Sequence, residues 1–266
     1  MRLKVIDLKQ TAPFIVLYED DCIIAVNKAS GIAICADRYD DSKERLDKLL
    51  AASLGLKKVY VVHRIDRDTS GLVVFAKDDK THRELSMAFE GRSIKKRYIA
   101  AVHGRPAWKE TVCDLPLVPN GNKQHHTIID KYQGKKSLTT FRLLGSAGNY
   151  SIIEALPETG RTHQIRVHLV SLGHPVVCDE LYGNTKPVYL SAIKKSWRGD
   201  TIEERPLLAR LGLHAAELLL PPLPGGRSSP PDTPEGLLLE APLARDMAAL
   251  IKQMEKCSGS VFKLKR

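Results

Sequence analysis

Two short apolar runs on either side of a polar segment constrain the fold of this chain more than any other sequence feature. The first run, residues 59–62, is rich in β-branched and aromatic side chains, and the second, residues 72–76, is equally apolar. The segment between them closes with Thr69, Ser70 and Gly71, which are typical turn residues, and glycine adopts a positive φ angle at little cost. The pattern therefore predicts a strand, a polar turn and a second strand.

Asp66 lies in this polar segment, where the first strand is expected to end. Arg64 and Arg67 flank it, and two neighbouring cations favour the charged form of its carboxyl group. A carboxylate that stays charged at the end of a strand can act as a nucleophile or as a base. A lone aspartate in a turn more often caps backbone amides, so the turn alone does not decide between these roles.

A second segment of interest begins with three cations, Lys95, Lys96 and Arg97. Tyr98 follows them, and an apolar run then extends over residues 99–102. This pattern predicts a strand that is buried on at least one face. From the pattern alone, Tyr98 is an aromatic side chain on a half-buried strand.

Residues 158–169 form a third segment that is rich in charged and polar side chains, while Ile165, Leu169 and the following Leu172 share one helical face. The apolar positions predict a helix that has Thr162 as its N-cap and stops at Gly173. Because the N-terminus of a helix favours anions, Arg161, Arg166 and the first amide groups could together hold a carboxylate or a phosphate.

Three histidines, His163, His168 and His174, lie in or near this helix. Neither neighbouring pair has the i,i+4 spacing that places two imidazoles on one helical face. We therefore predict no metal site here.

Together these segments resemble the RluA family of RNA pseudouridine synthases. The sequence His-Arg-Ile-Asp at residues 63–66, followed by Thr-Ser-Gly, is similar to the family's catalytic signature. Ala29 stands where the family usually has proline. The resemblance extends over residues 15–254, and its further segments follow in family order: VLYEDDCIIAVNKASGIAI, KRYIAAVHG, GRTHQIRVHLVSLGHP, VVCDELYGN and LHA.

The resemblance assigns roles to three residues. It implies that Asp66 is the catalytic aspartate and that Tyr98 lies against the target base, where its ring can stack and its hydroxyl group can transfer a proton. It also implies that Arg166 pairs with the catalytic aspartate, since a planar guanidinium group orients a carboxylate and keeps it charged. We expect further basic side chains to contact RNA, namely Arg64, Arg67, Lys95, Lys96, Arg97 and Arg161.

The implied activity is the isomerisation of specific uridines in tRNA or rRNA to pseudouridine. The target base has to be flipped out of folded RNA, and the reaction needs no cofactor and no metal. Two alternatives remain from the residues alone: an RNA-binding protein without activity, and a metal-dependent nucleic-acid enzyme.

The implied fold is an α+β pseudouridine synthase fold, with a mixed, largely antiparallel sheet, flanking helices and a central catalytic cleft. We expect residues 1–14 to be a lead-in, residues 15–256 to form the catalytic domain, and residues 257–266 to be a basic tail that frays. Many family members carry an N-terminal S4 RNA-binding domain. Only residues 1–14 precede the first shared segment here, so the resemblance implies a chain without that domain.

Other patterns predict the remaining elements. Turn residues are concentrated in residues 221–236, and basic residues with few apolar neighbours predict a mobile excursion at residues 184–206. The expected strands and helices are a hairpin of residues 14–18 and 22–27, a helix from Ser42 to Leu50, a helix from Asp78 or Asp79 to Gly91, a hairpin of residues 138–144 and 150–156, a strand at 211–218 and a helix at 243–254.

Composition agrees with a soluble RNA-binding enzyme. The 266 residues carry a formal net charge of +10, which suits either a polyanionic partner such as RNA or a surface charge that keeps the protein soluble. The five cysteines are scattered without a C-x-x-C motif, which predicts free thiols in a reducing compartment. No apolar stretch is long enough for a membrane span. We therefore expect a cytoplasmic monomer.

Overall fold

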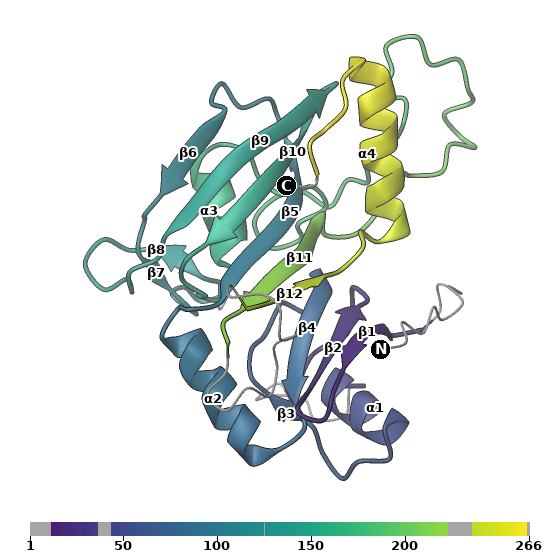
Figure 1. Cartoon of the computed structure of the whole chain (residues 1–266). Helices are drawn as coiled ribbons and strands as arrows, with labels where there is room; N and C mark the ends of the chain where they lie inside the picture. The colour runs from purple at the N-terminus through teal and green to yellow at the C-terminus, as the bar shows by residue number, and fades with distance from the viewer. Residues whose placement is uncertain (1–11, 37–43, 125, 223–235, 265–266) are drawn as a thin grey trace. The chain divides into compact units, whose positions relative to one another are not determined.

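The computed structural model describes residues 12–36, 44–124, 126–222 and 236–264 (Figure 1). The chain divides into two compact units. Unit 1 consists of Met1–Ile94 and Glu217–Pro242, and unit 2 consists of Lys95–Ala216 and Leu243–Arg266. The single catalytic domain expected over residues 15–256 and its central cleft stay predictions.

The sheet of unit 1 is built from the hairpins that the sequence predicts. Strand β1 (Phe14–Glu19) pairs antiparallel with β2 (Ile23–Lys28), and β2 pairs antiparallel with β4 (Ser70–Ala76). The short strand β3 (Tyr60–Val61) also pairs with β4, which confirms the predicted strand, turn and strand around Asp66. Strand β12 (Leu237–Glu240) pairs with the last four residues of β11 (Leu213–Leu220).

Two helices belong to unit 1. Helix α2 (Asp79–Glu90) begins as predicted, because Asp78 caps it by accepting hydrogen bonds from the amides of Lys80 and Thr81 at 2.9 Å each. Helix α1 (Leu46–Ser53) begins after Arg45, later than expected. The predicted cap Ser42 lies outside the described residues.

The sheet of unit 2 has the strand order β5, β10, β9, β6. The strands are β5 (Lys95–His103), β6 (Glu110–Cys113), β9 (Thr139–Ala147) and β10 (Tyr150–Pro157), and neighbours pair antiparallel. The predicted hairpin of residues 138–144 and 150–156 is confirmed as β9 and β10. A separate two-stranded sheet joins β7 (Leu117–Val118) to β8 (Ile128–Ile129).

Strand alternation gives this sheet two distinct faces, because neighbouring side chains point in opposite directions. Ile99 and Ile152 pack with helix α4 (Arg245–Ser258), which inserts Met247, Leu250, Ile251 and Met254 at helical spacing. Ala100, Val102 and Ile153 pack with helix α3 (Gln164–Ser171) instead. Unit 2 is thus a sheet with α3 on one face and α4 on the other.

Helix α3 does not begin as predicted. Its N-cap residue is His163 in the left-handed conformation, with φ 53°, and not Thr162. The predicted stop is confirmed, because the helix ends at Ser171 and Gly173 has a positive φ angle of 81°. Helix α4 extends to Ser258, four residues beyond its predicted end at residue 254.

The prediction of a frayed C-terminal tail is wrong for the part of the tail that the structure describes. Phe262 is buried in the same cluster as Met247 and Met254, and its amide donates to a carboxylate oxygen of Glu255 at 2.7 Å. Gly145 makes room for the ring, since a Cβ atom there would overlap with it. The sequence FKLKR looks basic, but its single aromatic residue is a core residue.

The basic excursion at residues 184–206 is anchored as well. Val188 and Ile193 are buried in the core of unit 2, and Val188 exchanges backbone hydrogen bonds with Leu207 and Leu208. The excursion is therefore packed against the unit at these points, while its basic side chains stay exposed.

The described chain is of the predicted α+β class. The strand pairs given above are antiparallel, and an isolated parallel bridge outside these strands joins Ala33 to Arg45. All five cysteines are free, as expected. Within the described ranges, no helix combines the length and the apolar composition that crossing a membrane requires.

Replacing Phe262 by alanine tests the packed tail. Phe262→Ala should lower the free energy of unfolding by about 3–5 kcal/mol, because it removes a buried ring and leaves a cavity. Val261→Ala is the matched control, since Val261 is 84% exposed and its replacement should change the free energy by no more than about 0.5 kcal/mol. Urea unfolding followed by circular dichroism gives both values. Equally small changes would contradict the packing.

Candidate functional site

The turn that carries Asp66 follows β3 in unit 1. Asp66 is half-buried, and its backbone carbonyl accepts a hydrogen bond from the amide of Thr69 at 3.1 Å. Gly71, the second residue of β4, has a φ angle of 112°, which favours glycine. The turn is thus closed by its own backbone before the chain enters the core of the sheet.

Lys28 fixes this turn from the neighbouring strand. Its side chain is fully buried, and its ammonium group donates hydrogen bonds to the carbonyl oxygens of Ala29 at 2.8 Å, Ile32 at 2.9 Å and Arg67 at 2.7 Å. A buried charge is tolerated when such polar groups replace the lost water. Because Arg67 directly follows Asp66, the Lys28 ammonium holds the backbone beside the candidate catalytic carboxylate.

Two further hydrogen bonds connect the same segments. The amide of Gly31 donates to the carbonyl oxygen of Arg67 at 2.9 Å. The hydroxyl group of Ser30 donates to the backbone carbonyl oxygen of Asp68 at 2.7 Å. Gly31 has a φ angle of 92°, so the segment needs glycine at this position. Residues 28–31 therefore support the Asp66 turn.

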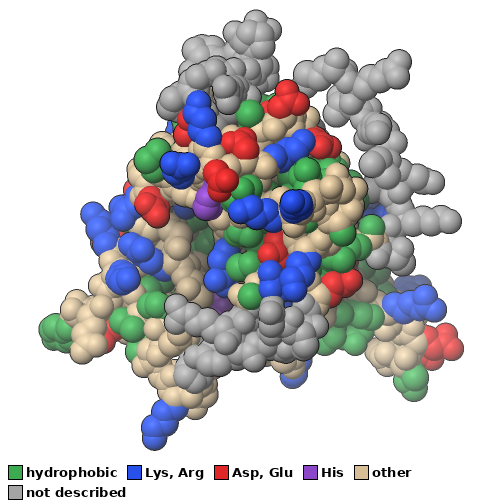
Figure 2. Space-filling view, turned by 90° about the horizontal axis from the view of Figure 1, so that it is seen from below, with side chains coloured by type: hydrophobic (Ala, Val, Ile, Leu, Met, Phe, Trp, Pro, Cys, Tyr) green, Lys and Arg blue, Asp and Glu red, His purple; other side chains and the backbone are tan. Residues whose placement is uncertain are grey.

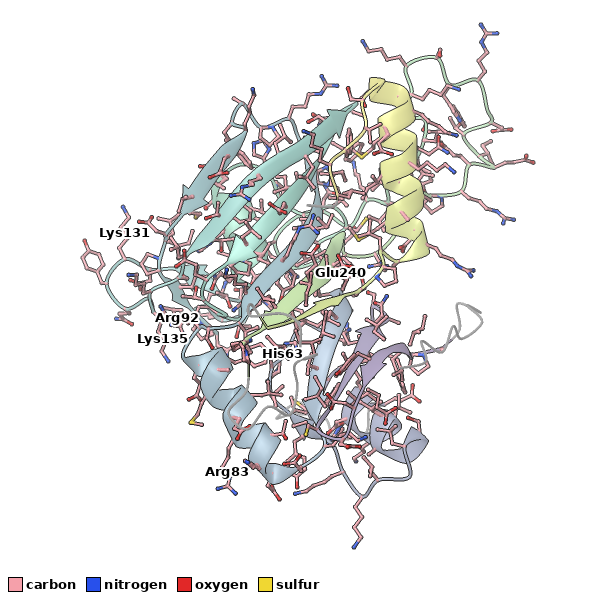
Figure 3. All side chains as sticks on the ribbon, viewed as in Figure 1. His63, Arg83, Arg92, Lys131, Lys135 and Glu240 are labelled. Carbon is pink, nitrogen blue, oxygen red and sulfur yellow. The ribbon has the colours of Figure 1, made fainter. Side chains whose placement is uncertain are left out.

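His63 fixes the beginning of the turn. Its Nε2 atom accepts a hydrogen bond from the amide of Val74 at 2.9 Å, and its ring stacks on Phe89 with 4.5 Å between centroids. Figure 3 shows His63 beside α2, the helix that carries Phe89. This histidine therefore has a structural role in unit 1.

The two arginines that flank Asp66 extend toward solvent. Arg64 is exposed, and Arg67 is exposed except for a surface ion pair with Asp68 at 3.2 Å. Exposed ion pairs contribute little to stability, so both guanidinium groups can contact phosphates at low cost.

Tyr98 lies on the α3 face of the unit 2 sheet. It is half-buried, it packs against the cluster of Ala100, Val102 and Ile165, and it pairs in register with Ala155. Lys96 shares this face by alternation, and its Nζ atom lies 3.6 Å from where a Cβ atom of Gly160 would be. The strand thus presents one aromatic side chain and one cation on the same side as α3.

Arg97 points to the opposite face, which overturns its expected role as an RNA contact. It is 5% exposed, its Nε atom donates to Glu154 at 2.5 Å, and its Nη2 atom donates to the carbonyl oxygen of Leu264. Glu154 also binds Arg142 at 3.3 Å. A guanidinium group that is buried in such a network is a structural group, because exposing it to RNA would leave Glu154 without this partner.

Arg166 is held in a fork by Asp179, a residue to which the sequence assigns no role. Its Nε and Nη2 atoms donate to the two carboxylate oxygens at 2.8 and 2.6 Å. Arg166 is 5% exposed and Asp179 is fully buried. Asp179 also accepts the amides of Leu181 and Tyr182 at 3.0 and 3.1 Å, so both sides of the fork are fixed.

Tyr182 completes the surroundings of Arg166. The guanidinium carbon lies 5.1 Å from the centroid of the tyrosine ring, a cation–π distance. The tyrosine hydroxyl accepts the amide of Thr127 at 2.8 Å and pairs with Nδ1 of His163 at 2.8 Å. Burial raises the pKa of Tyr182, so the hydroxyl group stays protonated. The sequence contains a signal for Asp179 and Tyr182, because both lie in the segment VVCDELYGN, which resembles the family.

The polar side chains at the beginning of α3 form a hydrogen-bonded network. Gln164 is buried, accepts from the hydroxyl of Thr159 at 2.7 Å and from the amide of Arg161 at 3.0 Å, and donates to Leu138 and Thr139. The Nε atom of Arg161 donates to the carbonyl oxygen of Lys136 at 3.2 Å. Arg161 is therefore tied to the loop that precedes β9.

The three histidines have separate partners. His163 pairs with Tyr182, and His174 pairs with the carbonyl oxygen of His103 at 3.0 Å. His168 pairs with Thr139 at 3.1 Å and with the carbonyl oxygen of Leu115 at 3.0 Å, and burial lowers its pKa. Across the residues that the structure describes, no three His, Cys, Asp or Glu side chains gather as metal ligands do.

Each unit thus presents one part of the predicted site. Unit 1 brings together Asp66, Arg64 and Arg67, and unit 2 places Tyr98 on the sheet face that packs with α3, the helix that carries Arg166. The pairing of Arg166 with Asp66 stays a prediction.

Comparison with known proteins identifies relatives. A family model described as RNA pseudouridylate synthase matches residues 22–171. The chain is 34% identical over 256 residues to ribosomal large subunit pseudouridine synthase D of Zymomonas mobilis, covering 92% of this chain and 74% of the relative. It is 33% identical over 210 residues to the dual-specificity RNA pseudouridine synthase RluA of Escherichia coli, covering 77% of this chain and 86% of the relative.

A solved structure shares the fold. The human protein RNA Pseudouridylate Synthase Domain Containing 4 superposes with a TM-score of 0.66 at 22% identity, over 90% of this chain and 92% of that one. The predicted fold of pseudouridine synthases is therefore confirmed.

Asp179→Asn should lower the stability of the protein much more than the same change in a fork that is only partly buried. It should lower the free energy of unfolding by about 3 kcal/mol, because it leaves the buried guanidinium of Arg166 without its counter-charge. Asp246→Asn is the matched control, since Asp246 forms a similar fork with Arg210, at 2.7 and 2.6 Å, but is 31% exposed. It should cost less than about 1 kcal/mol in the same urea titration. Equal losses would show that burial of the first fork is unimportant.

Proposed function

This chain belongs to the RNA pseudouridylate synthase family, and from this premise we propose that Asp66 is the carboxylate with which it converts uridine to pseudouridine in RNA. The observation that carries the proposal is the fixed turn of unit 1. Lys28, Ser30 and Gly31 bind the backbone at Arg67 and Asp68, while the Asp66 side chain stays partly accessible. A reacting group that is held by its surroundings loses little entropy when the substrate binds.

The reaction rearranges bonds within one nucleotide. The glycosidic bond between C1′ and N1 breaks, the uracil turns, and a bond forms between C5 and C1′. The proton on C5 leaves to solvent and N1 gains a proton, so product and substrate have the same composition. No electrons and no groups are transferred to a second molecule, and the proposal accordingly includes no cofactor.

Two roles for Asp66 agree with this rearrangement. It can attack the substrate as a nucleophile, or it can act as the base that starts the chemistry at the sugar. Tyr98 is the proposed partner of the base, offering its ring for stacking and its hydroxyl group for proton transfer. Arg166 is the proposed cation that orients the reacting carboxylate, and its fork with Asp179 and its contact with Tyr182 restrict its own rotamers.

The proposed substrate is a structured RNA, either tRNA or rRNA. The Zymomonas mobilis relative is named for the large ribosomal subunit, which supports rRNA, and the Escherichia coli relative is named for dual specificity, which supports more than one kind of RNA target. Flipping the target base costs a few kcal/mol, which phosphate contacts can offset. Arg64 is proposed to occupy the space that the base leaves.

The proposed RNA contacts are assigned residue by residue. Figure 2 shows Lys and Arg side chains in several groups on one face, with acidic side chains between them, so that face does not offer a single basic patch. Arg97 is omitted because it is buried. The remaining contacts are Arg64, Arg67, Lys95, Lys96 and Arg161, which are exposed or partly exposed.

The proposal also places the protein in the cytoplasm as a monomer. Its five cysteines are free, which suits a reducing compartment. The alternatives of an inactive RNA-binding protein and of a metal-dependent enzyme are not favoured, because the relatives are named as synthases.

Tritium release from RNA labelled at C5 of uridine tests the proposal. RNA comes from cells that lack this chain, and release is measured with excess enzyme in a single turnover. The wild-type protein should release tritium, and Asp66→Asn should release none above background, because the nearly isosteric amide lacks the charge and the nucleophilic oxygen. Both proteins should bind the RNA with similar affinity.

Asp68→Asn is the matched control. Asp68 lies in the same turn, its side chain is 43% exposed, and it forms a surface ion pair with Arg67. Its replacement should leave tritium release within about threefold of the wild-type rate, because exposed ion pairs contribute little. If Asp66→Asn releases tritium as fast as the wild-type protein, Asp66 is not the reacting group.

A further inference from the structure

One tyrosine of unit 2 is unusually exposed. The side chain of Tyr132 is 98% exposed, whereas the other tyrosines in the described ranges are all partly buried. Lys131 precedes it, and Lys135 and Lys136 follow, all three exposed. Aromatic side chains usually bury most of their surface. A ring that is fully presented to solvent among cations is suited to a ligand that has both a flat face and negative charge.

The turn that carries Tyr132 is fixed by its own hydrogen bonds. A carboxylate oxygen of Asp130 accepts the amides of Tyr132 at 2.8 Å and Gln133 at 3.0 Å, and these bonds lower the pKa of Asp130. The carbonyl oxygen of Asp130 accepts the amide of Gly134 at 3.0 Å. The backbone on both sides of the tyrosine is therefore closed into a defined turn.

The same turn is fastened to the neighbouring strand. The amide of Asp130 donates to the carbonyl oxygen of Pro116 at 3.1 Å, and Lys135 exchanges two backbone hydrogen bonds with Leu117, at 2.9 and 3.1 Å. Gly134 allows this approach, since a Cβ atom there would lie 2.7 Å from the carbonyl carbon of Pro116. Tyr132 thus extends from a rigid support, and binding to its ring orders little additional backbone.

Basic groups connect this turn to the beginning of α3. The Nε atom of Arg161 donates to the carbonyl oxygen of Lys136, and Lys96 lies close to Gly160, the neighbour of Arg161. Figure 3 labels Lys131 and Lys135 on the loop beside β7 and β8, on the outside of unit 2. The basic residues Lys96, Arg161 and Lys136 therefore follow one another along unit 2 toward the turn.

We propose that residues 130–136, the Tyr132 turn, bind an unpaired stretch of RNA by stacking a base on Tyr132 and pairing the phosphates with Lys131, Lys135 and Lys136. An aromatic ring accepts any base, because every base has a flat π face, while lysines track the phosphates. The inference rests on the proposed function only in taking RNA as the ligand. It adds a site that holds nucleotides other than the target uridine.

The test measures binding of a fluorescein-labelled single-stranded oligouridylate of 12 nucleotides by anisotropy. Tyr132→Ala should weaken binding about 5- to 150-fold, the range measured when one stacked base is lost. Tyr132→Phe keeps the ring and should bind like the wild-type protein. Val112→Ala, which alters another exposed apolar side chain of unit 2, should also bind like the wild-type protein.

An abasic oligonucleotide of the same length separates stacking from charge. It keeps the phosphates and lacks the bases, so wild-type protein and Tyr132→Ala should bind it equally. Lys131→Ala and Lys135→Ala should instead weaken both oligonucleotides, and each should reduce the slope of log affinity against log salt by about 0.7. Tyr132→Ala should leave that slope unchanged.

Two outcomes would overturn the inference. One is unchanged oligouridylate affinity in Tyr132→Ala, and the other is an equal loss of affinity for the abasic oligonucleotide. Neither outcome depends on isomerisation, so a protein that binds through Tyr132 but releases no tritium refutes the proposed function alone. A protein that releases tritium but binds independently of Tyr132 refutes this inference alone.

Discussion

The buried ammonium group of Lys28 is the interaction on which the candidate catalytic turn depends. A cation inside the sheet requires polar partners, and it finds them in three backbone carbonyl groups, one of which belongs to Arg67. Lys28 is thereby tied to the residue that follows Asp66. Methionine would fill the same space but remove the ammonium donor, and the carbonyl oxygen of Arg67 would then keep only the amide of Gly31 among the donors described above.

Unit 2 uses the same principle with opposite charges. The carboxylate of Asp179 is buried, and it is satisfied by the guanidinium of Arg166 and by two backbone amides. The ring of Tyr182 lies against that guanidinium. In both units, a buried charge is held by groups that cannot move far, which is what a preorganised site requires. The cost of burying these charges is offset only while every partner is in place.

The sequence predicted the local elements well and the long-range partners poorly. The Asp66 hairpin and the capped start of α2 follow from turn and cap chemistry over a few residues, and the structure confirms both. Arg97 follows Lys95 and Lys96 in one basic run, and the sequence therefore predicts an RNA contact for all three. Strand alternation, which is visible in the sequence, places Arg97 and Lys96 on opposite faces of the strand. The partner of Arg97 is Glu154, 57 residues further along the chain, and no local pattern connects the two. The burial of Phe262 similarly depends on a space left by Gly145, which no local pattern reveals.

The central claim is that this chain isomerises uridine in RNA without a metal ion or a cofactor. Analysis of the product tests this claim most directly. An unmodified transcript of a candidate tRNA or rRNA is incubated with the purified protein and EDTA, digested to nucleosides and separated by chromatography. The account predicts intact RNA in which uridine is lost and pseudouridine gained in equal amounts. Cleaved RNA, a requirement for added metal, or unchanged nucleosides from every RNA that the protein binds would contradict it.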